Sequence, residues 1–114
     1  MKNLNQIRAF NSLKEISGGV NDGEVVKKIP SMIMNNGLLA AAAFAVETGK
    51  GYQEVFEQAI IPHLADKTIG LLSKTMDLNA FIKFVSEADS QTLRLITAET
   101  MAYLEFLRRL NKRK

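Results

Sequence analysis

Hydrophobic residues recur along much of this chain at spacings of three and four, which is the period of one face of an α-helix. The first such stretch covers residues 2–16 and ends before the glycine pair Gly18 and Gly19. Its expected buried face consists of Leu4, Ile7, Phe10 or Ala9, Leu13 and Ile16. Three further stretches show the same period, at residues 52–72, 77–87 and 90–110. Because no stretch alternates convincingly with the period of a strand, the pattern predicts an all-helical protein.

Two prolines predict irregular points in these helices. Pro30 disfavours helical geometry in the residue before it, so we expect a break or kink near Ile29, after a short segment that begins at Glu24. Pro62 removes a backbone donor within its pattern and predicts a kink or a split near Ile61. The last two helices are expected to begin near Asp77 and at Asp89 or Ser90, and one of the latter two residues is expected to cap the last helix by accepting a hydrogen bond from its first turn.

The least polar part of the chain runs from Lys28 to Gly49. Its alanines and methionines favour helix over strand, and no polar side chain occurs from Gly37 to Val46. A helix that is apolar on every side must be covered on every side. We therefore expect a central helix that opens at Pro30 or Ser31, with the other helices packed around it.

The dipeptide Asn36-Gly37 inside this segment leaves two interpretations open. Asn-Gly commonly marks a turn, which would split the segment. The alternative, which we favour, is one continuous helix in which Gly37 lies within the helix or at a bend and packs closely against a neighbour. No alternating stretch flanks the pair, so a hairpin is not expected.

These patterns predict the fold class and the domain organisation together. The chain has 114 residues, which fits one domain with a single core. We expect an all-α fold in which residues 1–114 form a single helical domain, a bundle of about five helices around a central apolar helix.

Composition narrows the cellular setting. The chain contains no cysteine, which removes disulfides, thiolate metal sites and cysteine nucleophiles. Its longest apolar run is shorter than the roughly 18 to 20 residues of a membrane span. The first eight residues are too polar for a secretory signal. We therefore expect a cytoplasmic protein that does not enter a membrane.

Catalytic chemistry has few candidates in this sequence. His63 is the only histidine and has no neighbour at metal-ligand spacing, so a surface or packing role is expected. Glu54 and Glu57 lie three residues apart and are best interpreted as a solvated helix face. The loop around Gly49 and Gly51 lacks the spacing of a phosphate-binding loop. We expect no enzyme activity, no metal and no cofactor.

Positive charge gathers at the end of the chain. The formal net charge is +3, and five of the last seven residues are basic. Glu105 could pair with Arg108 and Arg109 at spacings of three and four, which would make these cations structural. The remaining surplus suits phosphate contacts without base readout. The candidate RNA-binding residues are Lys27, Lys28, Arg108, Arg109, Lys112 and Arg113.

A DNA-binding regulator is the alternative function. The segments 77–87 and 90–110 could form a helix-turn-helix with the second as recognition helix. However, the second segment carries an apolar stripe, and its charge lies at the far end instead of near its N-terminal half.

Two separated motifs resemble a known family. Residues 28–33 (KIPSMI), then Asn36-Gly37-Leu38 and Ala43-Phe44-Ala45, are similar to a Lys-Leu-Pro-hydrophobic opening, an Asn-Gly-Leu centre and an alanine-phenylalanine close. Residues 97–109 (TAETMAYLEFLRR) are similar to the same family's closing helix. The family is the small subunit of type III-B CRISPR effector complexes, the Cmr complex. Ile29 replaces its leucine and Phe106 its tryptophan, both apolar for apolar.

This resemblance implies a function that composition does not. It implies a non-catalytic structural subunit of a ribonucleoprotein that silences invading RNA in antiviral defence. Such a subunit stacks with copies of itself beside the backbone (RAMP) subunits, which cut the target, in a complex that also contains a large polymerase-like subunit. The implied partners are therefore those subunits, the crRNA and target RNA held by the complex, and further copies of this chain.

Overall fold

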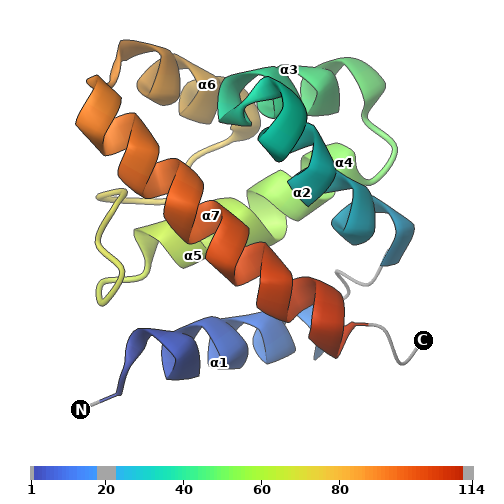
Figure 1. Ribbon diagram of the computed structural model, residues 1–114, viewed down its shortest axis with the longest axis vertical. Coiled ribbons are helices and arrows are strands. Elements are labelled where there is room, and N and C mark those ends of the chain that lie inside the picture. The colour runs from blue at the N-terminus through green and yellow to red at the C-terminus, as the bar shows by residue number, and fades with distance from the viewer. Residues whose placement is uncertain (1, 18–22, 112–114) are drawn as a thin grey trace.

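The computed structural model describes residues 2–17 and 23–111, and all regular structure in that part of the chain is helical. Six helical segments follow one another (Figure 1). They are α1 (Leu4–Ser17), α2 (Gly23–Asn36), α3 (Leu38–Thr48), a continuous run of α4 (Tyr52–Val55), η1 (Phe56–Ile60) and α5 (Ile61–Ala65), α6 (Leu78–Glu87) and α7 (Ser90–Leu110). The expected all-α fold class is confirmed.

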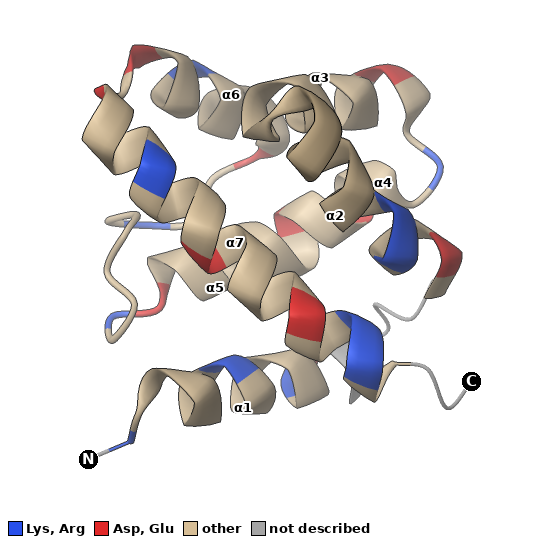
Figure 2. Cartoon of the chain, viewed as in Figure 1, with Lys and Arg blue, Asp and Glu red and all other residues tan. Residues whose placement is uncertain are grey.

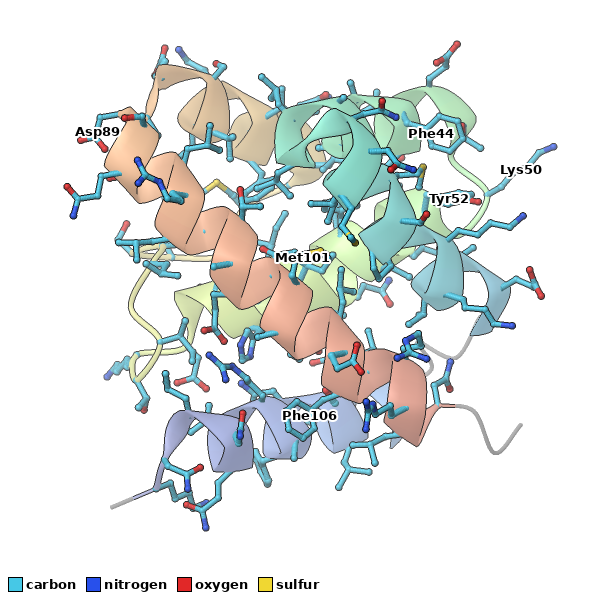
Figure 3. All side chains as sticks on the ribbon, in the orientation of Figure 1. Phe44, Lys50, Tyr52, Asp89, Met101 and Phe106 are labelled. Atoms are coloured by element: carbon cyan, nitrogen blue, oxygen red, sulfur yellow. The ribbon has the colours of Figure 1, made fainter. Side chains whose placement is uncertain are left out.

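Helices α7 and α1, from the two ends of the chain, pack against each other. Helix α7 crosses the molecule diagonally and packs against α1, α2 and α5 (Figure 1). Helix α1 lies at one end of the molecule, whereas α3 and α6 lie at the opposite end. Phe106, the residue that replaces the family's tryptophan, extends from α7 toward α1 (Figure 3).

The expected starts of the last two helices are confirmed, and an aspartate caps each of them. Asp77 Oδ1 accepts a hydrogen bond of 2.8 Å from the Ala80 amide at the start of α6. Asp89 Oδ1 accepts one of 2.7 Å from the Thr92 amide at the start of α7. Each bond satisfies an amide that has no partner within its own helix.

A kink or a split was expected near Ile61 because of Pro62, but the chain is not split there and instead changes helix type. The α-helical turns of α4 pass into a π-helical turn at Phe56–Ile60, and α-helix resumes at Ile61. A π turn shifts the hydrogen-bond register, which accommodates a residue without an amide hydrogen. The expected helical period to Leu72 is wrong, because α5 ends at Ala65 and turns follow. Leu72 nevertheless reaches the core and is buried.

The break expected near Ile29 is absent. Helix α2 runs through Pro30 without interruption. Val26, Ile29 and Ile33 lie on one face of α2 and are buried in the core. Burial of this face outweighs the local preference against helix before proline, which is a weak effect beside tertiary packing.

The continuous central helix is also wrong, because the chain divides at Gly37. Helix α2 ends at Asn36 and α3 begins at Leu38, with Gly37 between them at φ 93° and ψ 162°. Only glycine adopts this region at low cost. A Cβ at Gly37 would meet nothing within 4 Å, so the residue is required for its backbone angles and not for close packing. The structure shows no hairpin there.

The most deeply buried helical run is α4–η1–α5 and not the alanine-rich segment. Its fully buried side chains include Phe56, Ala59, Ile60, Ile61 and Leu64. Helix α3 buries one side only, against α2, α4 and α6. The expectation that the alanine-rich helix is covered on every side is therefore wrong, and part of it faces solvent.

Candidate functional site

Lys27 and Lys28 lie near the N-terminus of α2, and Arg108 and Arg109 lie in the last turn of α7. The N-terminus of α2 meets the C-terminus of α7, where a Cβ on Gly23 would be 3.8 Å from the Asn111 side-chain nitrogen. Figure 2 shows the basic segments of α2 and α7 in this region. Lys27 and Lys28 are exposed on α2. Lys112 and Arg113 lie outside the described residues, so the structure places four of the six candidates.

Arg108 and Arg109 are paired within their own helix. Arg108 donates to Glu105 Oε2 at 2.9 Å and Arg109 Nε donates to the same oxygen at 2.6 Å. The expected pairing of these two arginines with Glu105 is thereby confirmed. One carboxylate faces two guanidinium groups, so the cluster keeps a positive charge, to which Lys27 and Lys28 add.

A second constellation, which the sequence did not indicate, joins α1, α5 and α7 through buried polar groups. Arg8 on α1 contacts Glu99 on α7 through two hydrogen bonds, Nε to Oε2 at 2.8 Å and Nη2 to Oε1 at 2.6 Å. His63 on α5 donates from Nε2 to Glu99 Oε2 at 2.8 Å. Asn11 on α1 donates from Nδ2 to His63 Nδ1 at 2.9 Å and to Asp66 Oδ2 at 3.0 Å. We call these five residues the α1 network.

The protonation state of His63 follows from its two partners. A carboxylate accepts only, so Asp66 holds the Asn11 amide with its NH₂ group toward the ring. The His63 Nδ1 atom must then accept, which leaves its proton on Nε2. Burial lowers the pKa of His63 below its ordinary value of 6.5, although the Glu99 carboxylate opposes this. His63 is 2% exposed and its ring stacks on Tyr103 with centroids 4.1 Å apart.

The two carboxylates of the α1 network are held in their ionised form. The hydrogen bond from Asn11 is the main cause that lowers the pKa of Asp66. Burial by itself would raise the pKa of Glu99, but the hydrogen bonds from Arg8 and His63 outweigh burial and lower it. Glu99 is therefore a charged group close to the core, compensated by Arg8 on one side and by a neutral imidazole on the other.

A cavity of about 140 Å³ opens beside the His63 ring. It is lined by residues of α1, η1, α5, α7 and the turns after α5, including Lys14, Glu15, Asp66, Thr75 and Tyr103. The Tyr103 hydroxyl is buried near Ser12, and neither oxygen makes a well-formed hydrogen bond within the described residues. Burial raises the pKa of Tyr103, and the nearby Glu15 carboxylate adds to this effect. These hydroxyls are not poised to ionise.

The apolar stripe of α1 faces outward. Leu4, Phe10 and Leu13 are 47%, 57% and 53% exposed, so the expected buried face is wrong for these three residues. Ile7 is buried as expected. The ammonium groups of Lys2 and Lys14 lie 5.2 and 6.0 Å from the Phe10 ring centroid, which surrounds this aromatic side chain with positive charge. Phe10 and Leu13 are three residues apart and lie on one side of α1, and we call these two residues the α1 face.

A second exposed apolar region lies on α3, at the opposite end of the molecule from α1. Leu39, Phe44 and Val46 are 39%, 39% and 41% exposed, and Glu47 beside them is exposed as well. The Phe44 ring packs edge-on against Tyr52 of α4 at 5.2 Å between centroids (Figure 3). Leu39 and Val46 are seven residues apart and lie on one side of α3, whereas Phe44 lies on another side, so we call Leu39 and Val46 the α3 face. Apolar side chains gathered at two opposite ends are typical of contact surfaces.

Of Glu54 and Glu57, which were expected to form a solvated helix face, only Glu57 differs from that expectation. Glu57 Oε2 accepts a hydrogen bond of 2.7 Å from the Leu78 amide and so joins η1 to the start of α6. Glu54 is exposed, as expected. No cluster of three metal-ligating side chains occurs among the residues that the structure describes. None of the described helices is long and apolar enough to cross a membrane.

Sequence reasoning missed the α1 network for a specific reason. Its members lie 52, 55, 36 and 91 residues apart in the four cross-helix pairs, so no local motif joins them. One signal was available. Arg8 and Asn11 on α1 and Glu99 on α7 each lie on a helical face where a polar residue would need a partner once the helices pack.

Comparisons with known proteins give one match. Searches of curated proteins and of solved structures returned no match to this chain. The family model described as CRISPR-associated protein (Cas_Cmr5) matches residues 6–113, which is nearly the whole chain and includes both motifs that suggested the resemblance. The chain belongs to the Cas_Cmr5 family of CRISPR-associated proteins.

Proposed function

We propose that this chain is a non-catalytic structural subunit of a type III-B CRISPR ribonucleoprotein effector complex. In that role it acts in the cytoplasm as a single helical domain, stacks beside the backbone subunits and supports guide and target RNA during antiviral defence. The observation that carries the proposal is the family match over residues 6–113.

An RNA-supporting role is favoured by the basic cluster at the meeting point of α2 and α7. Lys27 and Lys28 are exposed near the N-terminus of α2, and the Glu105-paired Arg108 and Arg109 lie near the C-terminus of α7. Lysines can bind RNA phosphates without recognising the bases. Such contacts are sufficient here, because the guide RNA already selects the target by base pairing.

A stacking role is favoured by the two exposed apolar faces. The α1 face is rimmed by Lys2 and Lys14, and the α3 face has Glu47 beside it. The two faces lie at opposite ends of the molecule (Figure 1). When two different surfaces of one chain are complementary, copies join head to tail and form an open stack. We therefore assign the α1 face of one copy to the α3 face of the next.

A non-catalytic role is favoured by the state of the polar side chains that come together. His63 has both ring nitrogens engaged, and it is buried beneath α1. Glu99 is engaged by Arg8 and His63. A general base must be free to reach a substrate proton, and these two groups are committed to holding helices together.

The helix-turn-helix alternative loses support for a geometric reason. A recognition helix must offer one face to the major groove, whereas α7 packs against α1, α2 and α5. Its buried side chains include Ile96, Thr100, Tyr103, Leu104 and Leu107. In the exposed N-terminal half of α7, Arg94 is the single basic residue, which leaves little for base or phosphate contacts.

The RNA role is tested by the salt dependence of RNA retention. The chain is co-expressed with the other subunits of its complex and a guide RNA, and target binding is measured from 50 to 300 mM salt. In the variant with Lys27→Ala and Lys28→Ala, the slope of log affinity against log salt should fall by about 0.7 for each phosphate that the lysines no longer neutralise. The matched control replaces two exposed lysines elsewhere, Lys67→Ala and Lys74→Ala, and should keep the wild-type slope. Equal slopes for all three proteins would remove the α2 lysines from the RNA role.

A further inference from the structure

Helix α1 is attached to the rest of the protein mainly by polar contacts. Among its described side chains, Ile7 is the single buried hydrophobic one, whereas Asn11 and Ser12 are buried polar residues and Arg8 is half-buried. The helices at the other end are attached differently, since α6 buries Leu78, Phe81 and Val85. The stability of α1 on the bundle therefore depends on the charge state of the α1 network.

We propose that Asn11, His63 and Asp66 form a pH-dependent latch, which holds α1 against α5 and α7 while His63 is neutral and loosens α1 when His63 is protonated. This inference concerns the fold itself and does not depend on RNA binding or on assembly.

The geometry defines what protonation does. In the neutral state Asn11 Nδ2 donates to His63 Nδ1 at 2.9 Å. A proton on Nδ1 would put two donors against each other at that distance. Rotation of the Asn11 amide would relieve the conflict, but it would turn the Asn11 oxygen toward the Asp66 carboxylate, now 3.0 Å from Nδ2. Either arrangement costs a hydrogen bond between α1 and the α5 region.

Charged and titratable groups from three directions face the His63 ring. They are Arg8, Lys14 and Glu15 on α1, Glu99 and Tyr103 on α7, and Asp66 directly after α5. Glu99 and Asp66 favour the imidazolium form, whereas burial and Arg8 disfavour it, and burial is the largest of these effects. The pKa of His63 is consequently lowered. The hydrogen bond from Asn11 agrees with this, because it requires an unprotonated Nδ1.

The sign of the pH effect follows from that lowered pKa. With α1 detached, His63 is hydrated and titrates near its ordinary value of 6.5. The attached state binds the proton less well, so the attachment is fully stable above pH 6.5 and weakens as the pH falls below 6.5. Glu99 and Asp66 also have lowered pKa values, and their ordinary values are 4.5 and 3.8. Their protonation weakens the same attachment in a second, more acidic window.

The latch is tested by amide hydrogen exchange on the full chain, corrected for intrinsic rates, at pH 7.5 and pH 5.5. Exchange reports local opening of α1 separately from that of α6. We expect α1 amides to lose up to about tenfold protection relative to α6 amides at pH 5.5, because this pH lies one unit below the ordinary pKa of 6.5 that His63 has once α1 is detached. Equal loss in both helices, or a His63 imidazole that titrates at or above pH 6.5 by NMR, would overturn the proposal.

Two variants sharpen the test. Gln in place of His63 keeps one acceptor and one donor but does not titrate, so His63→Gln should show no change in α1 protection relative to α6 between pH 7.5 and 5.5. The double variant Asn11→Asp with Asp66→Asn, which we call the exchanged pair, swaps the two side chains and keeps the net charge. The carboxylate at position 11 can then accept a hydrogen bond from a protonated His63 Nδ1. Asn at position 66 can still accept from the Thr68 amide, as Asp66 does at 2.9 Å.

The exchanged pair should raise the His63 pKa above 6.5 and reverse the sign, so that α1 becomes better protected at pH 5.5 than at pH 7.5. A wild-type pH response in the exchanged pair would contradict the latch. If the exchanged pair does not fold, the comparison of wild type with His63→Gln decides, because a pH response that persists without an imidazole would also contradict it.

Discussion

Apolar residues recur at helical spacing in both α1 and α6, yet α6 buries these residues and α1 leaves most of them exposed. In α6 the periodic residues Leu78, Phe81 and Val85 are buried. In α1 the periodic residues Phe10 and Leu13 are more than half exposed. The helical period thus identifies which residues share a face, but the face that is buried depends on what the rest of the chain offers.

The difference arises from partners far away in the sequence. Helix α6 meets an apolar surface that includes Phe56, whose ring lies 6.4 Å from that of Phe81. Helix α1 meets Glu99 and His63, which would be left unpaired against an apolar face. A buried charge without a partner costs more than an exposed leucine, so the polar side of α1 turns inward.

The largest contrast is expected from truncating one phenylalanine in each helix. Phe81 is fully buried, so Phe81→Ala should lower the free energy of unfolding by about 3 to 5 kcal/mol. Phe10 is 57% exposed, so Phe10→Ala should change it by no more than about 0.5 kcal/mol. Urea unfolding followed by circular dichroism measures both. Similar losses of stability for the two variants would mean that the Phe10 side of α1 is buried and does not face solvent.

A smaller but still large effect is expected at the centre of the α1 network. Glu99→Ala removes the acceptor of both Arg8 and His63 and should cost about 3 kcal/mol, because breaking one partner leaves the others uncompensated. The matched control is Glu87→Ala, which removes an exposed ion pair with Lys83 and should leave stability within about 0.5 kcal/mol. A loss at Glu99 no larger than that at Glu87 would show that α1 is not held by this network.

The smallest effect in the comparison concerns the helix caps. Asp77→Ala removes the cap of α6, a helix with a buried apolar face, and should cost about 1 kcal/mol in global stability. Asn3 caps α1 by accepting from the Gln6 amide at 2.9 Å, and the Gln6 side chain accepts in return from the Asn3 amide at 2.8 Å. Asn3→Ala should affect exchange at the first α1 amides more than the unfolding midpoint. A larger global loss at Asn3 than at Asp77 would reverse this ranking of the two helices.

Local signals predicted the fold class and several boundaries well. Helix α6 begins next to Asp77 and helix α7 next to Asp89 as expected, because capping is decided within four residues of sequence. Pro62 marked an irregular point correctly, although the helical run changes type there and is not split. The family motif around Asn36-Gly37 was informative even though its expected geometry was wrong, since the residues identify the family while the backbone angles of Gly37 divide the helix.

Features that depend on tertiary contacts could not be predicted. Continuation of α2 through Pro30 requires the burial of Ile29, which the sequence around it does not reveal. The inward orientation of Asn11 requires His63 and Asp66, more than fifty residues away.

The pairing of Arg108 and Arg109 with Glu105, in contrast, was predictable because the three residues lie within about one helical turn.

The central claim is that α1 is held by its polar side so that its apolar face can contact another subunit. Its most direct test is co-purification of Phe10→Asp with the other subunits of the complex, beside Leu95→Asp on α7, a residue 53% exposed but outside both apolar faces. We predict that both variants keep the wild-type unfolding midpoint and that Phe10→Asp alone is absent from the assembled complex. Full retention of Phe10→Asp, or unfolding of the free protein by this substitution, would contradict the account.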